Sequence, residues 1–181
     1  MKIAIIGYGG MGSFHAENLK HYAETSPEYP LELAGIYDID PARAAVAEKN
    51  GIRAYAGARE IREDKSVGAV LIATPNDFHA GYVKEAAEAG KNIICEKPIA
   101  LTEKQAEEMY GYAEKAGVLF EVQQNRRWDD DYLTVKNIYD HPENIGGVYR
   151  IESRVMGGNG IPGGWRKKAA QGGGMMLDWG V

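Results

Sequence analysis

The chain of 181 residues contains very little cysteine, no run of basic residues and no long apolar segment. Its single cysteine, Cys95, excludes an internal disulfide and a cysteine-based zinc cluster, and agrees with a reducing compartment. The formal net charge is −5, so no basic patch predicts binding to nucleic acid or to an anionic membrane surface. The N-terminal apolar segment, Ile3 to Ile6, is too short for a secretory signal or a membrane span. These absences predict a cytoplasmic protein with no nucleic-acid partner, membrane partner or metal site.

Five short apolar runs alternate with amphipathic stretches along the first two thirds of the sequence. The apolar runs predict buried parallel strands, namely Lys2 to Ile6, Leu31 to Tyr37, Val67 to Ala73, Asn92 to Cys95 and Val118 to Val122. The amphipathic stretches predict helices, namely Ser13 to Ala23, Ala42 to Asn50, Phe78 to Ala89 and Glu103 to Ala116. This alternation predicts an α/β fold with a doubly wound parallel sheet, the Rossmann arrangement, over residues 1–122.

The character of the sequence changes after Val122. Trp128 and several tyrosines follow, then a predicted strand at Val148 to Val155 and a glycine-rich loop from Gly157 to Gly174. We therefore expect a second, different domain to occupy residues 123–181.

A glycine-rich turn follows the first predicted strand at once. Its residues are Gly7, Tyr8, Gly9, Gly10, Met11 and Gly12, and a predicted helix begins directly after them. In such a strand, turn and helix, Gly7 makes the tight turn, Gly9 lets the backbone approach a pyrophosphate, and Gly12 lets helix and strand pack closely. The phosphates then lie at the positive end of the helix dipole. The pattern favours a dinucleotide-binding site over a turn whose glycines serve packing alone.

Two acidic residues, Asp38 and Asp40, follow the second predicted strand, where a carboxylate usually holds the adenosine ribose hydroxyls. Asp40 precedes Pro41 and a helical stretch, which is typical of an N-cap followed by proline at the first helical position. Asp38 is therefore predicted to bind the ribose, and the alternative is a solvated turn aspartate. A carboxylate there repels a 2′-phosphate, so NAD is favoured as the cofactor and NADP remains possible.

Polar residues follow the third and fourth predicted strands, and ligands of an open α/β sheet lie beyond the carboxyl ends of its strands. Thr74-Pro75-Asn76-Asp77-Phe78-His79 comes after the third strand, and Glu96-Lys97-Pro98 comes after the fourth. Lys97 leaves a buried strand directly, and Pro98 confines its backbone to extended conformations. Its ammonium group is placed to bond a substrate oxygen near a nicotinamide. An ion pair with Glu96 at the sheet edge is the alternative.

Together these motifs resemble those of the glucose-fructose oxidoreductase and inositol dehydrogenase family, the Gfo/Idh/MocA family, over the entire chain. The matching pieces are the glycine turn, Ala73-Thr74-Pro75-Asn76 with His79, Glu96-Lys97-Pro98, Asn125-Arg126-Arg127-Trp128, Gly164-Trp165-Arg166, and Gly172-Gly173-Gly174-Met175-Met176-Leu177-Asp178-Trp179-Gly180. Each piece is weak alone, but their order and spacing are specific. The resemblance implies an NAD(P)-dependent dehydrogenase that moves a hydride between the nicotinamide and a hydroxyl-bearing carbon of a sugar, cyclitol or related polyol.

The resemblance also implies roles for individual residues. Lys97 is expected to hold the reacting oxygen and to help relay its proton, and Asp178 to be the acid of the family's Asp-x-x-x-His pair. The nicotinamide half of the cofactor cleft is expected to be lined by Ala73, Thr74, Asn76, His79, Glu96 and Lys97. The substrate side is expected to include Lys97, Arg126, Trp165, Arg166 and Asp178.

Other interpretations stay open for some of these residues. Asp178 can be a carboxylate at a helix start, and Trp165 can pack in a core. Only one of Arg126 and Arg127 is expected in the site, because either can serve in a surface salt bridge. Three histidines match no family motif and are interpreted as ordinary surface or helix residues, namely His15, His21 and His141.

The sequence departs from the family pattern at its end. The Asp-x-x-x-His pair requires a histidine at the position after Val181, where the sequence stops. The expected general base and most of the second, α+β domain would then be missing, which predicts an incomplete domain over residues 123–181 and slow turnover by this chain alone. For the complete protein the resemblance implies a homo-oligomer.

Three functions are compatible with these patterns. The first, which we favour, is an NAD(P)-dependent oxidoreductase that lacks its C-terminal part here. The second is a non-catalytic dinucleotide-binding module that needs a partner chain. The third is an NAD-dependent glycosidase of the same fold, in which transient oxidation at one sugar carbon permits elimination at another. All three require the cofactor site.

Overall fold

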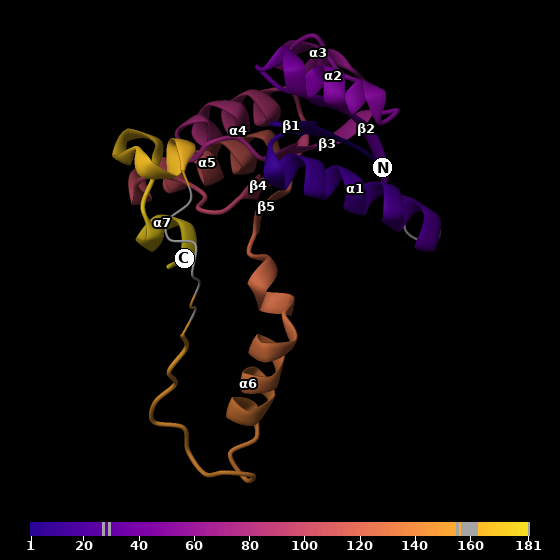
Figure 1. Cartoon of the computed structure of the whole chain (residues 1–181). Helices are drawn as coiled ribbons and strands as arrows, with labels where there is room; N and C mark the ends of the chain where they lie inside the picture. The colour runs from indigo at the N-terminus through magenta and orange to yellow at the C-terminus, as the bar shows by residue number, and fades with distance from the viewer. Residues whose placement is uncertain (27, 29, 155, 157–162, 181) are drawn as a thin grey trace. The chain divides into compact units, whose positions relative to one another are not determined.

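The computed structural model describes residues 1–26, 28, 30–154, 156 and 163–180 (Figure 1). Its contacts divide the chain into two units, one made of residues 1–123 with the segment from Gly163 onward, and the other of residues 124–162. Residues 163–180, predicted as part of a second domain, instead pack with the first unit. Two polar contacts link this segment to residues 1–123, because Lys97 bonds to Asp178 and Asn76 donates to the Gly172 carbonyl.

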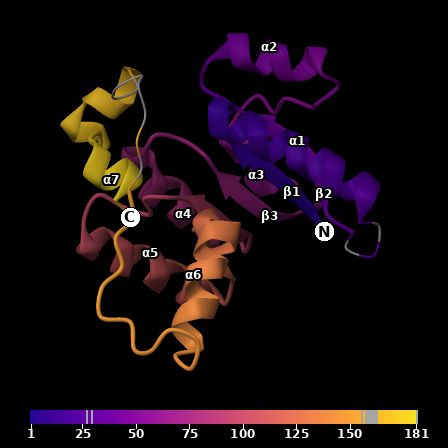
Figure 2. The same cartoon turned by 60° about the horizontal axis from the view of Figure 1, so that its bottom comes forward.

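The first unit contains a five-stranded sheet and the helices that connect its strands (Figures 1 and 2). The strands are β1 (Lys2–Ile6), β2 (Glu32–Tyr37), β3 (Val67–Ile72), β4 (Asn92–Glu96) and β5 (Phe120–Gln123). The helices are α1 (Gly10–Thr25), α2 (Pro41–Lys49), α3 (Ala58–Glu63), α4 (His79–Glu88) and α5 (Glu103–Ala116). Neighbouring strands are parallel in the order β2-β1-β3-β4-β5, which confirms the predicted doubly wound α/β class.

Alternate residues of the interior strand β1 contribute to two apolar cores, one on each face of the sheet. Ala4 and Ile6 belong to a cluster with residues of α3, α4 and α5, whereas Ile3 and Ile5 belong to a cluster with Ala16 of α1. Successive side chains of a strand point to opposite faces, so a parallel sheet covered on both sides needs apolar residues at every position. Because all neighbouring strands are parallel, the carboxyl ends of the five strands lie at one edge of the sheet, and the polar loops begin there.

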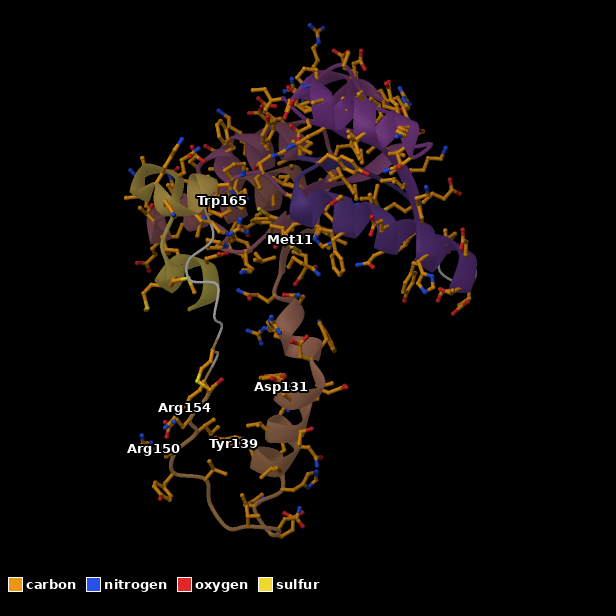
Figure 3. All side chains as sticks on the ribbon, viewed as in Figure 1. Met11, Asp131, Tyr139, Arg150, Arg154 and Trp165 are labelled. Atoms are coloured by element: carbon orange, nitrogen blue, oxygen red, sulfur yellow. The ribbon has the colours of Figure 1, made fainter. Side chains whose placement is uncertain are left out.

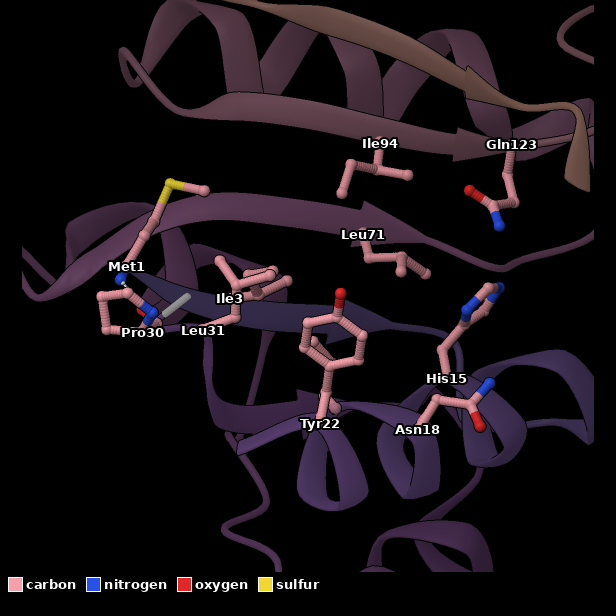
Figure 4. A pocket seen from close by; sticks show the side chains of 11 residues that line it. Met1, Ile3, His15, Asn18, Tyr22, Pro30, Leu31, Leu71, Ile94 and Gln123 are labelled. Atoms are coloured by element: carbon pink, nitrogen blue, oxygen red, sulfur yellow. Dashed lines mark hydrogen bonds between the residues drawn. The ribbon is translucent and has the colours of Figure 1, made fainter. Parts of the chain in front are cut away.

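A groove of about 610 Å³ runs beside α1 on the second of these faces (Figure 4). Ile3, Leu71 and Ile94 line it from the sheet, and His15 and Tyr22 line it from α1. His15 therefore faces the sheet rather than bulk solvent.

The ends of the helices follow local signals in the sequence. Asp40 caps α2 as predicted, since its carboxylate accepts the Ala42 N–H at 2.9 Å and Pro41 is the first helical residue. Helix α5 ends at Ala116, and the φ of +66° at the following Gly117 is the left-handed conformation that favours glycine. Helix α1 differs from the prediction, because it begins at Gly10, inside the glycine turn.

Among its described residues, the C-terminal segment of the first unit has only short helical elements. It contains two 3-10 turns, Gly164–Lys167 and Ala169–Gln171, and the helix α7 (Met175–Trp179). The predicted glycine-rich loop overlaps this segment, and its residues 157–162 lie outside the described part of the chain.

The second unit contains a 3-10 turn, Asn125–Trp128, and the helix α6 (Asp130–Asp140), which has no buried residue. The predicted strand at Val148 to Val155 is wrong for residues 148–154, which have no regular structure, and Val155 lies outside the described residues. A strand requires a hydrogen-bonded neighbour, and the described residues of this unit provide none.

Candidate functional site

The glycine turn lies at the carboxyl end of β1, and two of its glycines have no room for a side chain. Gly7 has a φ of +94°, and a Cβ atom there would lie 2.6 Å from the carbonyl oxygen of Ala73. A Cβ atom at Gly12 would lie 1.8 Å from the carbonyl oxygen of Gly7. The positive φ and the close approach of α1 to the turn therefore both require glycine.

The first turn of α1 has backbone donors without an intrahelical acceptor. The first helical bond is donated by the Ser13 N–H to the Gly9 carbonyl at 2.9 Å, so the N–H groups of Gly10, Met11 and Gly12 precede the bonded ladder. A Cβ atom at Gly10 would meet nothing within 4 Å, and Met11 is 37% exposed (Figure 3). This open cradle at the positive end of a helix fits a pyrophosphate.

Asp38 follows β2 and fastens the glycine turn to that strand. Its Oδ2 atom accepts the Tyr8 N–H at 2.6 Å, its Oδ1 atom accepts the Asp40 N–H at 2.8 Å, and its side chain is only 4% exposed. The sequence argument set Asp38 apart from Asp40 because Asp40 is engaged in a helix cap, but Asp38 also binds backbone amides. Its contact with the ribose stays a prediction.

Lys97, Asp178 and Arg166 come together beyond the carboxyl end of β4. The Lys97 ammonium group donates to the backbone carbonyl of Asp178 and lies 3.4 Å from Oδ1 of the same residue. The Nε–H group of Arg166 donates to Asp178 Oδ2 at 2.8 Å. The Asp178 side chain is 9% exposed and that of Lys97 is 27% exposed. A ligand can therefore reach the ammonium group, while the carboxylate behind it serves as a shared acceptor.

Trp165 restrains the orientation of Arg166. The Cζ atom of the guanidinium lies 4.5 Å from the centroid of the Trp165 ring, which is labelled in Figure 3. Stacking on an aromatic face and a hydrogen bond to a carboxylate together fix the plane of a guanidinium group. The Arg166 guanidinium is thus held on two sides, by the Trp165 ring and by Asp178.

Glu96, the last residue of β4, is buried and bonded through both carboxylate oxygens. Its Oε1 atom lies 2.6 Å from Nε2 of His15, and its Oε2 atom accepts the Lys97 N–H at 3.2 Å. The interpretation of His15 as an ordinary surface or helix residue is wrong, because His15 is 8% exposed and joins α1 to β4. A sequence signal existed: Gly12, His15 and Ala16, the buried residues of α1, have the i, i+3, i+4 spacing of one helix face.

The loop after β3 is held from inside by two side chains that were predicted to line the cofactor cleft. Asn76 is 3% exposed, and its Nδ2–H group donates to the Gly172 carbonyl at 3.1 Å. His79 is fully buried, with Nδ1 3.0 Å from the Pro98 carbonyl oxygen and Nε2 3.1 Å from that of Thr74. A neutral His79 ring has one N–H group, so it donates a hydrogen bond to a carbonyl of one of these loops and lies against that of the other. The ring is turned inward at the start of α4 instead of lining the cleft.

Replacing His79 with alanine is expected to lower the free energy of unfolding by about 2 to 4 kcal/mol, because the change removes a buried ring and the partner of two loops. Burial lowers the pKa of His79, against the opposing effects of the neighbouring carbonyl groups and Glu96. The unfolded state takes up a proton near pH 6.5, whereas the folded state resists it. Wild-type stability should therefore fall as the pH drops below that value, and His79→Ala should lose less of its stability over the same range.

Urea unfolding at several pH values measures both effects. His21→Ala is the control, because His21 is an exposed residue of α1 and its loss should leave the pH dependence of the wild type unchanged. A His79→Ala protein with the full wild-type pH dependence would contradict a buried, neutral ring.

Arg126 belongs to the second unit, where its Nη1–H group donates to Asp129 at 2.7 Å. Its predicted role on the substrate side stays a prediction.

Among the described residues, no group of three or more His, Cys, Asp or Glu side chains is arranged to hold a metal ion. In the same described ranges, no helix combines the length and the apolar composition needed to cross a membrane.

Comparisons with known proteins point to one family. A family model described as an oxidoreductase family with an NAD-binding Rossmann fold matches residues 1–124. The crystal structure of an NAD-binding protein from Listeria innocua is 41% identical, with a TM-score of 0.92, over 99% of this chain and 51% of that one. A myo-inositol 2-dehydrogenase of Thermotoga maritima is 34% identical over 158 residues, 85% of this chain and 45% of the relative. A scyllo-inositol 2-dehydrogenase (NADP(+)) of Bacillus subtilis is 30% identical over 139 residues, 76% of this chain and 37% of the relative.

The chain spans about half the length of these relatives or less. The matched residues 1–124 contain the glycine turn, Asp38 and the loops after β3 and β4, and the cradle at the start of α1 fits the phosphates of the cofactor NAD. The chain therefore belongs to the Gfo/Idh/MocA oxidoreductase family, and its first unit has the family's NAD-binding Rossmann fold.

Proposed function

We propose that the chain forms the cofactor-binding part of a dehydrogenase that transfers a hydride between NAD(H) and a hydroxyl-bearing carbon of a cyclitol, sugar or related polyol. The observation that carries the proposal is the Lys97 ammonium group, bonded to Asp178 at the edge of the sheet where the glycine turn also lies. A bound nicotinamide supplies the carbon that accepts or returns the hydride. The relatives named as inositol 2-dehydrogenases support a cyclitol as the substrate class.

Lys97 and Asp178 divide the work on the hydroxyl group in this proposal. Lys97 passes one proton to Asp178, and the neutral amine then accepts the proton of the hydroxyl as the carbonyl forms, so that the ammonium group is restored and donates a hydrogen bond to the carbonyl oxygen. Arg166 keeps the Asp178 carboxylate in one orientation through its bond to Oδ2, which leaves Oδ1 on the side of Lys97. The pair therefore stabilises the oxygen and moves its proton.

Glu96 and His15 are positioning residues in the same proposal. Glu96 accepts the backbone N–H of Lys97, and His15 holds the other oxygen of Glu96 from α1. The helix whose start binds the phosphates and the loop that carries Lys97 are thus joined by two buried side chains. Cofactor binding and the placement of the ammonium group depend on the same pair of contacts.

Titration of the chain with NADH and NADPH, followed by nicotinamide fluorescence, tests the cofactor site, and saturable binding is the expected result. Reduction of NAD by the chain completed with the family's C-terminal part, in the presence of inositol isomers and sugars, then tests the reaction. Binding without any NAD reduction would favour a non-catalytic dinucleotide-binding module. Aryl-glycoside cleavage that requires NAD without net NADH formation would indicate a glycosidase. The absence of binding by both nucleotides would contradict all three functions.

A further inference from the structure

The segment that carries Asp178 is attached to the loop after β3 by a buried side chain, that of Asn76. Asn76 is 3% exposed, and its Nδ2–H group donates to the backbone carbonyl of Gly172, 96 residues later, at 3.1 Å. A Cβ atom at Gly172 would lie 2.8 Å from the same Nδ2 atom, so the amide and the backbone are in close contact. The sequence predicts Asn76 in the cofactor cleft, whereas the fold directs its N–H donor at Gly172.

Gly172, Gly173 and Gly174 form a turn that leads the backbone into α7, here called the Gly172–Gly174 turn. Backbone hydrogen bonds join this turn to the 3-10 turns before it. The Gly173 N–H donates to the Lys168 carbonyl, and the Gly174 N–H donates to the Arg166 carbonyl, both at 3.0 Å. The whole stretch is therefore expected to shift as one piece if its contact with the loop after β3 is lost.

Asp178 lies one helical turn after these glycines. Its backbone N–H donates to the Gly174 carbonyl at 3.1 Å, within the short helix α7. Met175 and Met176, the first residues of α7, are 41% and 81% exposed, so their side chains contribute little packing that could hold the helix in place. The position of Asp178 relative to Lys97 therefore depends on polar contacts, and the bond that anchors the turn is one of them.

We propose that Asn76 is a positioning residue for the Lys97–Asp178 pair. It holds the Gly172–Gly174 turn against the loop after β3, so that α7 presents the Asp178 carboxylate to the Lys97 ammonium group. This inference rests on the proposed function, which assigns the proton transfer to that pair. The Lys97 Nζ atom is 3.4 Å from Asp178 Oδ1, near the limit of a hydrogen bond, so a displacement of the turn by about 1 Å breaks the contact. Asn76 thus acts on turnover through the backbone.

In the protein completed with the family's C-terminal part, Asn76→Ala is expected to lower kcat with a polyol by about tenfold and to change the affinity for NADH by less than about threefold. Asn76→Leu should cause the same loss, because leucine is close to asparagine in size but has no N–H donor. The leucine variant thus separates the missing hydrogen bond from the cavity that alanine leaves. Steady-state reduction of NAD gives kcat, and fluorescence titration gives the Kd of NADH.

The reactivity of the Lys97 amine gives a second readout, which needs no turnover and uses this chain alone. Hydrogen bonds to the charged form keep an ammonium group protonated and slow to react with an acylating reagent. Release from Asp178 should make acetylation of Lys97 by acetic anhydride about threefold faster or more in both Asn76 variants. Peptide mass spectrometry measures this rate against that of Lys104, which is 84% exposed and serves as the internal reference.

Asn92→Ala is the matched control, because Asn92 also donates from its amide to a glycine carbonyl. Its Nδ2–H group donates to Gly68 at 3.2 Å, and its Oδ1 atom accepts the Leu119 N–H at 3.0 Å. Asn92 is the first residue of β4, whereas Lys97 follows the last. The substitution should lower the stability of the fold, while kcat and the acetylation of Lys97 stay as in the wild type.

Three results would overturn the role of Asn76. The first is a wild-type kcat together with a wild-type rate of Lys97 acetylation in both Asn76 variants. The second is a loss of kcat or of NADH affinity with no change in the acetylation of Lys97, because Asn76 would then act on the cofactor or by another route than the pair. The third is an equal loss of kcat and an equal rise in acetylation in Asn92→Ala, which would reflect lower stability alone.

All three results leave the proposed function intact, because the wild-type protein would still bind NADH and reduce NAD. Failure of the proposed function is a different result. A completed wild-type protein that binds NADH but reduces no NAD with any polyol contradicts that function. Faster acetylation of Lys97 in the Asn76 variants, with Asn92→Ala unchanged, would even then support the positioning of the pair by Asn76.

Discussion

Gly12→Ala is expected to weaken NADH binding by at least about 100-fold, a loss of about 3 kcal/mol, and to lower the free energy of unfolding by about 3 kcal/mol. The added Cβ atom would lie 1.8 Å from the carbonyl oxygen of Gly7 and 2.8 Å from its carbonyl carbon. Both are backbone atoms, so no side-chain rotation relieves the clash. The start of α1 must move away from the turn after β1.

The loss of binding follows from the same displacement. The N–H groups of Gly10, Met11 and Gly12 are in the first turn of α1, and they fit a pyrophosphate only while that turn stays against Gly7. Fluorescence titration with NADH measures the affinity, and urea unfolding followed by circular dichroism measures the stability. The two readouts should fall together, because one backbone contact supports both.

Gly111→Ala is the control for the chemical change. Gly111 lies in the solvent-exposed part of α5, and a Cβ atom there would meet nothing within 4 Å. The substitution should leave NADH binding unchanged and raise the free energy of unfolding by about 0.5 to 1 kcal/mol, because alanine favours a helix over glycine. A Gly12→Ala protein that binds NADH as the wild type does would show that α1 does not pack on the turn as described.

Sequence periodicity was sufficient to predict the bounds of helices and strands that depend on neighbouring residues alone. β1 spans Lys2–Ile6 and α5 spans Glu103–Ala116, with the predicted bounds. A buried strand that ends at a glycine, and a helix that ends before a left-handed glycine, are both defined by residues next to each other in the chain. The predicted strand is wrong for residues 148–154, because a strand also needs a hydrogen-bonded neighbour, which an apolar pattern cannot reveal.

Contacts between distant parts of the chain were beyond that reasoning. Asp38 was predicted to be available to a ribose, but Tyr8, 30 residues earlier, occupies one of its oxygens. The buried bond between His15 and Glu96 spans 81 residues, as does the contact of Lys97 with Asp178. The first of these was missed, whereas the family resemblance placed Lys97 and Asp178 together in the site. Motif order thus indicated residues that the fold brings together, while the burial of each side chain depends on contacts that the motifs do not contain.

In the protein completed with the family's C-terminal part, Lys97→Met is expected to reduce turnover with a polyol by a factor of about 10² to 10⁴ while changing the affinity for NADH by less than about threefold. Methionine keeps most of the length of the side chain but removes the ammonium group that bonds to Asp178. The phosphate cradle belongs to α1 and does not include this group, so cofactor binding should survive. Steady-state reduction of NAD measures turnover, and NADH fluorescence measures binding.

Lys104→Met is the matched control, because Lys104 is 84% exposed on α5 and the same substitution there removes a charge without touching the site. Asp178→Asn adds a second test, since it preserves the shape of the acceptor and removes its charge. If Lys97 relays the proton toward Asp178, both site variants should lose turnover, and combining them should cost little more than either alone, because residues that act as a unit are not additive. A Lys97→Met protein with wild-type turnover would contradict the role of the ammonium group. Losses that instead multiply in the double variant would mean that Lys97 and Asp178 act independently on the substrate.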